Sequence, residues 1–384
     1  MSRRPRAAAV DAEEAAPEAD RLEGFAHPRD TATLFGQQAA EQALAVALTS
    51  GRMHHAWLLT GLEGIGKATL AYRFARTALA TTAERKQIPA GTLSVSADTI
   101  VAKQVHVLSH PGLMVIRRPW QRDTKRLASV ITVDEVRRIK GFLQHSASQG
   151  AYRVVIIDRA EEMNTAAANA VLKSLEEPPQ RTVFLLISSE PGRLLPTIQS
   201  RCRRLDLKPL ATDDLLSALA APLAAAGHDI PTADATRLVS ALAEGSVRRA
   251  LTLIAGGAVE QHGKLVGLLT ALPQLDFEAV HKFAESVGAH GAEQDFQTCF
   301  TLLLGLLARA LRTKATGKTP IAEEAHLFSR LFPADASGAR LATWAELWET
   351  SLREKSEVLA LNLDRKAFVI DTFHRIEAAS RSAV

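Results

Sequence analysis

The segment between Tyr152 and Arg204 constrains the fold more strongly than any other part of the chain. An apolar run, Val154–Ile157, ends in Asp158; a helical segment follows, and a second apolar run, Val183–Ile187, ends in two serines. Short apolar runs separated by a helix are typical of parallel strands buried on both faces. Because parallel strands end at one edge of their sheet, the polar residues after each run are expected to meet there. The segment therefore predicts an α/β domain with a site at its carboxyl edge.

Composition sets the broad class of the protein. The chain has 384 residues, of which 47% are hydrophobic and only 5% aromatic, so its cores consist mainly of Ala, Leu and Val. This length allows two or three domains, and this composition favours packed helices over an all-β fold. The net charge of +4 is too small to indicate nucleic-acid binding by itself.

Cysteine content and hydropathy indicate the compartment. Cys202 and Cys299 are the two cysteines, which excludes a disulfide scaffold and a four-cysteine zinc site and fits a reducing cytosol. No zinc is expected. No apolar run approaches the ~18 residues that a membrane span needs. Residues 1–23 are predicted to be a disordered leader, since they lack the apolar core of a signal peptide. We expect a cytoplasmic protein that does not contact a membrane.

A glycine-rich loop lies before the segment between Tyr152 and Arg204. Gly61, Gly64, Gly66 and Lys67 match the pattern G-x-x-x-x-G-K, between a short apolar run and a good helix. In such loops backbone amides converge on phosphate oxygens, the helix adds its positive end, and the lysine reaches the outer phosphates. A plain strand-to-helix turn without a ligand is the alternative interpretation.

Two substitutions affect the chemistry that this loop usually supports. The pattern requires Ser or Thr after the lysine to hold magnesium, but Ala68 stands there, and Thr69 points about 100° away on a helix. Asp158 is placed to hold magnesium through water, or else it is a turn residue. Arg159 follows it and cannot accept a proton from water. ATP binding is therefore predicted to be weak or vestigial, and intrinsic ATPase activity to be lost or weak.

Two further segments have less regular patterns. Residues 80–111 are polar and weakly patterned. Arg117–Arg126 holds five cations and one acid and is predicted to be a loop, either solvated or in contact with DNA phosphates. Beyond Pro209 the chain reads as helical to its end, with Trp344–Ala379 among its clearest segments.

Three motifs carry a specific resemblance. They are Asn169-Ala-Val-Leu-Lys-Ser-Leu-Glu-Glu-Pro-Pro179, Ser200-Arg201-Cys202 and Gly245–Leu251, and they follow the glycine loop in order. With these motifs the chain resembles the AAA+ clamp-loader family of bacterial DNA polymerase III over about residues 30–260. The family's motor subunits carry an intact loop, an Asp-Glu pair and zinc cysteines, from which this chain departs. Its degenerate loop and retained Ser-Arg-Cys fit a largely inactive stator subunit.

The resemblance implies an architecture and a set of partners. Residues 24–208 would form the AAA+ P-loop α/β domain, residues 209–262 a helical lid, and residues 263–384 an all-α collar for oligomerisation. The partners would be the motor (gamma/tau) and delta subunits, the sliding clamp and, through the complex, primer-template DNA at the nucleoid-associated replisome. The alternatives are an ATP-hydrolysing motor subunit and an AAA+-derived adaptor outside replication.

The resemblance also assigns roles to single residues. Arg201, in Ser-Arg-Cys, would reach in trans into the ATP site of a neighbouring motor subunit, where a guanidinium stabilises charge on the γ-phosphoryl group. A surface arginine paired with a nearby acid is the alternative. Arg248 would be the second sensor of the γ-phosphate, or else a surface residue of the lid. Cys202 is interpreted as a packing residue.

Overall fold

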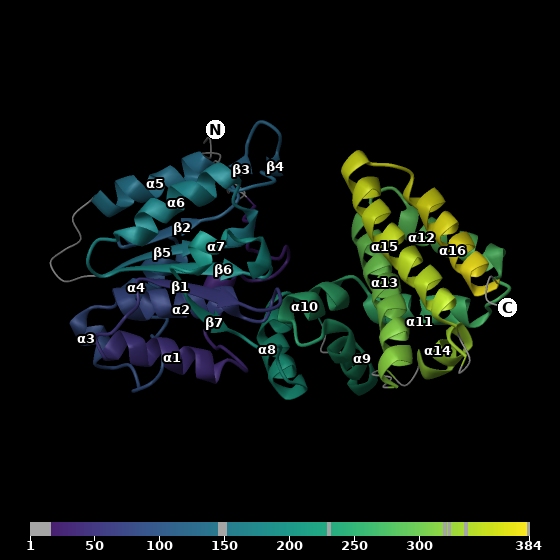
Figure 1. Cartoon of the computed structure of the whole chain (residues 1–384). Helices are drawn as coiled ribbons and strands as arrows, with labels where there is room; N and C mark the ends of the chain where they lie inside the picture. Colours follow the sequence, from purple (N-terminus) through teal and green to yellow (C-terminus); the bar gives the residue numbers. More distant parts are fainter. Residues whose placement is uncertain are drawn as a thin grey trace, which may run out of the picture. The chain divides into compact units, whose positions relative to one another are not determined.

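The computed structural model describes residues 17–144, 152–228, 232–317, 321, 324–333 and 337–381. It divides into two compact units, Met1–Lys208 and Pro209–Val384 (Figure 1). The first unit is α/β, and every regular element described in the second is a helix. The predicted fold class, a parallel α/β sheet domain followed by a helical part, is confirmed.

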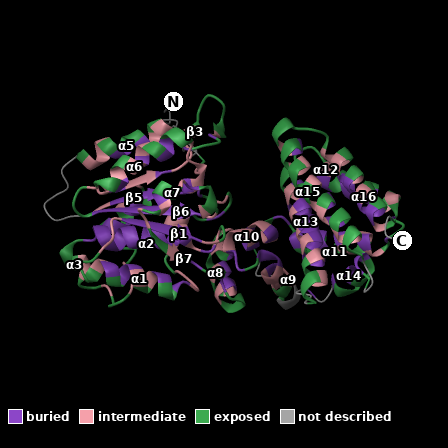
Figure 2. Ribbon diagram, in the orientation of Figure 1, coloured by how far each residue is buried: buried purple, intermediate pink, exposed green. Residues whose placement is uncertain are grey.

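The first unit is built around a parallel sheet of five strands in the order β2-β5-β6-β1-β7. Its strands are β1 (Ala56–Thr60), β2 (Leu113–Ile116), β5 (Arg153–Ile157), β6 (Thr182–Ser188) and β7 (Arg203–Asp206), and a separate antiparallel pair consists of β3 (Trp120–Gln121) and β4 (Arg126–Leu127). Every residue of β1 and β6 is buried, as Figure 2 shows for the centre of the sheet. This burial on both faces explains the continuous apolar runs of the sequence.

Helices cover the sheet of the first unit. They are α1 (Gln38–Thr49), α2 (Lys67–Leu79), α3 (Thr82–Arg85), α4 (Ile100–His106), α5 (Val133–Gln144), α6 (Thr165–Glu176) and α7 (Pro196–Gln199), with short 3-10 turns η1 (Pro28–Asp30), η2 (Ala160–Glu162) and η3 (Pro191–Arg193). Helices α5 and α6 pack on one another and on the apolar cluster of β5 and β6. The weakly patterned residues 80–111 contain α3 and α4, and Leu93, Val101 and Val105 are buried there.

The second unit is a stack of helices. They are α8 (Thr212–Ala225), α9 (Ala233–Ala243), α10 (Val247–Ala255), α11 (Ala258–Thr270), α12 (Phe277–Gly288), α13 (Glu293–Thr316), α14 (Ala325–Leu331), α15 (Gly338–Leu361) and α16 (Arg365–Arg381). The predicted boundary between residues 262 and 263 falls inside α11, and the division into lid and collar stays a prediction. Within the described residues, no helix is both long and apolar enough to cross a membrane.

Two expectations about local structure were wrong. Trp344–Ala379 is not one helical segment, because Asn362 adopts a left-handed conformation that ends α15, and the Asp364 carboxylate accepts a hydrogen bond from the Ala367 amide at the start of α16. The basic stretch Arg117–Arg126 is not only a loop, since it contains the β3–β4 pair. In both cases short polar side chains and turn geometry outweighed the hydropathy pattern.

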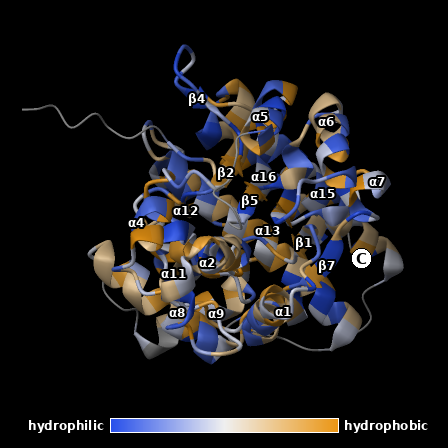
Figure 3. Cartoon of the chain, turned by 90° about the vertical axis from the view of Figure 1, so that its left-hand side faces the viewer, coloured by the Kyte–Doolittle hydropathy of each residue, from blue (hydrophilic) through white to orange (hydrophobic). Residues whose placement is uncertain are grey.

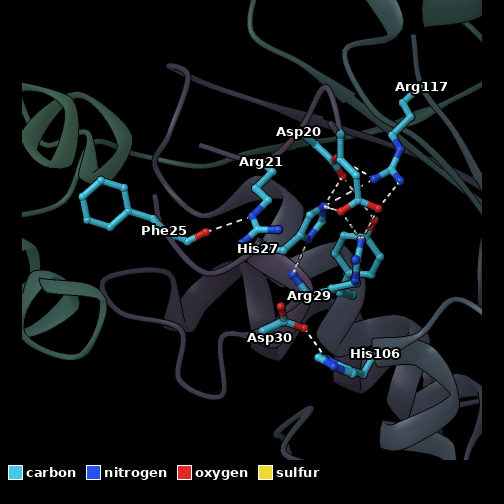
Figure 4. A network of polar contacts seen from close by, with 10 residues as sticks. Asp20, Arg21, Phe25, His27, Arg29, Asp30, His106 and Arg117 are labelled. Carbon is cyan, nitrogen blue, oxygen red and sulfur yellow. Dashed lines mark hydrogen bonds and ion pairs between the residues drawn. The ribbon is translucent and has the colours of Figure 1, made fainter. Parts of the chain in front are cut away.

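The predicted leader also ends earlier than expected. Residues 1–16 lie outside the described part, but Asp20 is buried within the first unit, with its side chain 2% exposed. Its carboxylate lies 2.9 Å from His27 Nε2 and 2.5 Å from Arg117 Nη1, and Glu18 pairs with Arg29 at 2.8 Å and also with Arg117 (Figure 4). Composition favoured disorder, but the acids of this segment have cationic partners far along the chain.

This network leads to a prediction about pH-dependent stability. Burial by itself would raise the pKa of Asp20, but the hydrogen bond from His27 and the charge of Arg117 outweigh it and lower the pKa from 3.8 to about 2. Because the folded-state pKa is depressed, the stabilisation is complete above pH ~4 and is lost as the pH falls towards 2. The shift corresponds to about 2 kcal/mol.

We expect Asp20→Asn to lower the free energy of unfolding at pH 6 by about 2 kcal/mol, with a deficit that shrinks below pH 4. Urea denaturation at pH 6 and at steps down to pH 3 measures this. Asp134→Asn is the matched control, because the Asp134–Arg137 pair is exposed on α5 and should contribute less than about 1 kcal/mol. A deficit for Asp20→Asn that does not change with pH would contradict the assignment.

Candidate functional site

The glycine loop between β1 and α2 lies at the carboxyl edge of the sheet, and its carbonyl groups accept hydrogen bonds from the side chain of Lys67. Lys67 Nζ donates to the carbonyl oxygens of Gly61 (2.6 Å) and Leu62 (2.5 Å) and to the hydroxyl of Ser189 (3.0 Å). These acceptors use all three ammonium hydrogens. Burial lowers the pKa of Lys67 to about 8, opposed by the negative charge of Glu161. A phosphate oxygen would have to compete with these acceptors for the ammonium.

Two glycines of the loop are required by its geometry. Gly61 has φ 131°, and a Cβ there would lie 2.5 Å from the carbonyl oxygen of Leu207. Gly66 has φ 102°, and a Cβ there would lie 2.9 Å from Leu34 Cδ1. Gly64 also has a positive φ, 78°. The loop conformation is therefore one that side-chain-bearing residues rarely adopt.

Gln37 fixes this loop to the end of the sheet domain, and sequence reasoning missed it. Its Nε2 donates to the carbonyl oxygens of Ile65 (3.1 Å) and Lys208 (2.7 Å). Gln37 is buried at the start of α1. Nothing in the local pattern distinguishes it from other polar residues, because both acceptors are backbone groups remote in sequence.

Asp158 ends β5 at the same edge and is buried. Burial and, to a smaller extent, the negative charge of Asp20 raise the pKa of Asp158 to about 7. Near pH 7 the Asp158 carboxyl is therefore neutral in a large fraction of molecules, and a neutral carboxyl is a weaker ligand for a divalent cation. Ala68, in the first turn of α2, offers no oxygen ligand.

Arg159 stands next to Asp158 and carries a guanidinium that reaches the glycine loop. It adopts a left-handed conformation with φ 48° and pairs with Glu63 of the loop and with Glu162 at 3.3 Å. A cation held in this way cannot act as a general base. The pairing attaches the turn after β5 to the loop after β1.

Glu161 is linked to Lys67 by two hydrogen bonds through Ser189. Its Oε1 accepts a hydrogen bond from the Ser189 amide at 3.0 Å, and the Ser189 hydroxyl accepts one from Lys67. Its second oxygen is buried without a hydrogen-bond partner among the described residues. Sequence reasoning missed this contact, because spacing alone does not show that η2 turns Glu161 towards β6.

Arg201 lies at the opposite edge of the sheet from the glycine loop. It precedes β7, which runs parallel to β1 with Arg203 beside Trp57, whereas the loop follows the far end of β1. At about 3.3 Å per residue, the five residues of β1 separate these two edges by roughly 16 Å. Arg201 is thus remote from the phosphate loop of its own chain.

The Arg201 guanidinium pairs with an acid at this edge. Its Nη2 lies 2.8 Å from Glu176 Oε1, and its Nη1 donates to the carbonyl oxygen of Thr197 at 2.9 Å. Both members of the ion pair are substantially exposed, at 36% and 49%. An exposed pair of this kind contributes less than about 1 kcal/mol and is easily exchanged for a stronger anion.

The other predicted site residues are placed as follows. Arg248 lies in α10 of the second unit, after Gly245, whose φ is 79° and where a Cβ would lie 2.6 Å from the Leu210 amide nitrogen. Its role as a sensor stays a prediction. Cys202 packs against the apolar cluster of β5, β6, α5 and α6, as expected of a packing residue.

One group among the described residues has the spacing of metal ligands, and the sequence analysis missed it. Donor atoms of Glu18, Asp20 and His27 lie within 4.8 Å of one another (Figure 4). His27 Nδ1 accepts a hydrogen bond from the Arg29 amide at 3.0 Å, so its Nε2 carries the hydrogen that faces Asp20. Arg117 supplies the positive charge that a metal ion would bring. These residues form an ion-pair network.

Comparisons with known proteins agree with this geometry. Residues 36–211 match the family model described as DNA polymerase III, delta subunit. Subunit delta' of DNA polymerase III from Pseudomonas aeruginosa is 40% identical over 163 residues, which cover 42% of this chain and 46% of that protein. Subunit tau from Escherichia coli is 27% identical over 299 residues, 73% of this chain and 44% of that protein. The chain spans about half the length of these curated relatives.

A solved structure is also similar to this chain. It is a DNA polymerase III gamma subunit-related protein from Thermotoga maritima, with 20% identity and a TM-score of 0.41 over 88% of this chain and 99% of that one. This TM-score is too low to support an inference by itself.

The glycine loop at the carboxyl edge of this parallel sheet is typical of nucleotide-binding domains of the P-loop type. The motif match over residues 36–211 then narrows the class. Over these residues the chain is similar to DNA polymerase III, delta subunit, and to the delta' subunit from Pseudomonas aeruginosa.

The burial of Cys202 and Cys299 can be tested through the reactivity of their thiols. Burial raises the pKa of both Cys202 and Cys299 to about 12. Because the thiolate is the reactive form, we expect both thiols of the folded chain to react far more slowly with Ellman's reagent at pH 8 than those of the chain in guanidinium chloride. A Cys299→Ala variant isolates Cys202, and a thiol there that reacts as fast as free cysteine would contradict the packing role.

Proposed function

We propose that this chain is the delta-prime subunit of a DNA polymerase III clamp loader. In that role it is a stator that helps to load the sliding clamp onto primed DNA, and it supplies Arg201 to the ATP site of a neighbouring motor subunit. The position of Arg201 carries the proposal. It lies at the edge of the sheet that faces away from the chain's own glycine loop, so it does not contact a phosphate bound in that loop.

The chain's own phosphate edge supports a stator over a motor. Ala68 supplies no metal ligand, the pKa of Asp158 is raised to about 7, and Arg159 replaces a general base with a cation. Each feature weakens a different requirement of phosphoryl transfer. These requirements are a hydroxyl ligand for the metal ion, a negatively charged carboxylate beside it, and a base that activates water. Lys67 remains, so weak nucleotide binding is retained while turnover is lost. Gly61, Gly64 and Gly66 would hold the phosphates, and Arg248 would be the second sensor of the γ-phosphate.

The proposed partners follow from the similarity to subunits of DNA polymerase III. The motor (gamma/tau) subunits would face Arg201, and the delta subunit would contact another surface of the chain. Residues 263–384 would form the oligomerising collar, with residues 209–262 as the lid. The complex would act on the sliding clamp and on primer-template DNA in the cytoplasm.

The trans role of Arg201 predicts a specific defect. In a reconstituted clamp loader, Arg201→Ala should lower the ATPase rate stimulated by clamp and DNA, with a loss at the affected site on the order of 10³-fold, because the guanidinium no longer stabilises the transferring phosphoryl group. Steady-state phosphate release measures this rate. Assembly should be unchanged, because Arg201 contributes only an exposed ion pair to its own fold.

Two control variants sharpen this experiment. Arg193→Ala removes an exposed arginine that pairs with Glu190 on η3 and should leave the ATPase rate unchanged. Glu176→Gln removes the partner of Arg201 and keeps the guanidinium, so activity should be maintained. An Arg201→Ala complex that assembles and hydrolyses ATP at the normal rate would rule out the trans role.

The degenerate loop predicts an unusual dependence on magnesium. At pH 6.5 the isolated chain should bind ATP with an affinity that magnesium changes by less than about threefold, because Asp158 is mostly protonated. As the pH rises through about 7 to 8.5, Asp158 ionises and the magnesium effect should increase. Equilibrium titration of a fluorescent ATP analogue, with magnesium or with EDTA, measures this.

Two variants act as controls for nucleotide binding. Asp158→Asn should abolish the pH dependence of the magnesium effect, and Lys67→Ala should weaken binding roughly 10- to 100-fold, as expected for a lost charge-assisted contact. The motor alternative rests on the similarity to subunit tau and on the Glu161–Ser189–Lys67 chain of contacts. Rapid ATP turnover by the isolated chain that Lys67→Ala abolishes would favour that alternative.

A further inference from the structure

The hairpin formed by residues 117–127 separates its cations into two groups. Arg117 and Arg118, at its base, are both ion-paired. Arg122, Lys125 and Arg126 lie around the turn and are exposed. Their side chains make no ion pair or hydrogen bond among the described residues. This division was not visible in the sequence, where the five cations form one basic run.

The base of the hairpin is fixed firmly to the domain. Arg117 contacts Asp20 at 2.5 Å, and Arg118 Nε lies 2.8 Å from Glu162 Oε2. The Ala128 amide donates to the carbonyl oxygen of Pro119 at 2.9 Å, and Ala128 is buried. The base therefore holds the two short strands in place without using the cations of the turn.

The turn presents an excess of positive charge on a narrow support. Trp120 pairs with Leu127 and Gln121 with Arg126 in β3 and β4. Asp123 is the one acid between residues 117 and 127. Lys125 adopts φ 49°, which closes the turn. Figure 3 shows this hairpin as a hydrophilic projection near β4. Cations that repel each other across a short ribbon are stabilised by a ligand with closely spaced negative charges.

We propose that the tip of this hairpin, Arg122, Lys125 and Arg126, binds the phosphodiester backbone of duplex DNA. A two-stranded ribbon is narrow enough to enter the major groove, and three exposed cations without acidic partners are suited to contact the negatively charged backbone phosphates. On the neighbouring helix α5, Arg137 and Arg138 differ in this respect, because each pairs with an acid on its own helix. This contact goes beyond the proposed function, on which it rests only for the choice of DNA over RNA.

The test uses the full chain without partner subunits. The variant Arg122→Gln/Lys125→Asn/Arg126→Gln removes the three charges, and Asn tolerates the left-handed conformation at position 125. Fluorescence anisotropy of a labelled primer-template duplex is measured at several salt concentrations between 50 and 200 mM. The matched control is Arg137→Gln/Arg138→Gln, which removes two exposed but ion-paired cations from α5.

Neutralising three phosphate contacts should reduce the slope of log affinity against log salt by about 2.7. The wild-type chain should therefore lose roughly 40-fold more affinity than the variant over this range. The control variant should keep the wild-type slope. Circular dichroism and the urea midpoint show whether the variant folds, and Arg122→Glu alone should weaken binding if the triple variant does not fold.

Two outcomes overturn the proposal: a wild-type chain that does not bind duplex DNA at 50 mM salt, or a triple variant whose affinity and slope equal those of the wild type. Because no ATPase or assembly is measured, failure here is separable from failure of the trans role of Arg201. A chain that binds DNA through the hairpin while Arg201→Ala has no effect would keep this inference and reject the stator function.

Discussion

The parallel pairing of β1 with β6 on one side and β7 on the other is the constraint on which the functional geometry depends. Because these strands run in one direction, every loop after a strand lies at one edge and every residue before a strand lies at the other. Lys67, Asp158 and Ser189 meet at the carboxyl edge. Arg201 and Glu176 meet at the amino edge. One chain therefore presents a glycine loop at one edge and an arginine at the other.

The carboxyl edge combines a glycine loop of fixed shape with charged side chains that pair with one another. Its glycines adopt a backbone conformation that other residues rarely adopt, and Gln37 fixes the loop to the end of the domain. Arg159 pairs with Glu63, and the pKa of Asp158 is raised because it is buried near a second acid, Asp20. The shape of the loop depends on the sheet that packs around it, whereas its charges depend on single side chains.

Arg117 connects two features that lie far apart in sequence. It neutralises Glu18 and Asp20 in the N-terminal segment and, in doing so, anchors the base of the β3–β4 hairpin. The buried Asp20 contributes stability only while it is ionised and paired. The exposed cations of the hairpin tip, in contrast to Arg117, have no acidic partners among the described residues. A basic run that reads as uniform in the sequence thus contains structural cations and cations available to a ligand.

The sequence by itself determined the strands, the glycine loop and the main helices, because apolar runs, glycines and caps act over a few residues. The apolar run Val154–Ile157 lies within β5, and the absence of a hydroxyl at Ala68 and of a base at Arg159 is a property of the sequence alone. Contacts between remote segments were decided by the tertiary structure. Burial of Asp20, the direction of Glu161 and the division of the hairpin cations each depend on partners tens of residues away. The edge on which Arg201 lies was likewise set by the pairing of β7 with β1, since spacing along a chain carries no information about which strands become neighbours.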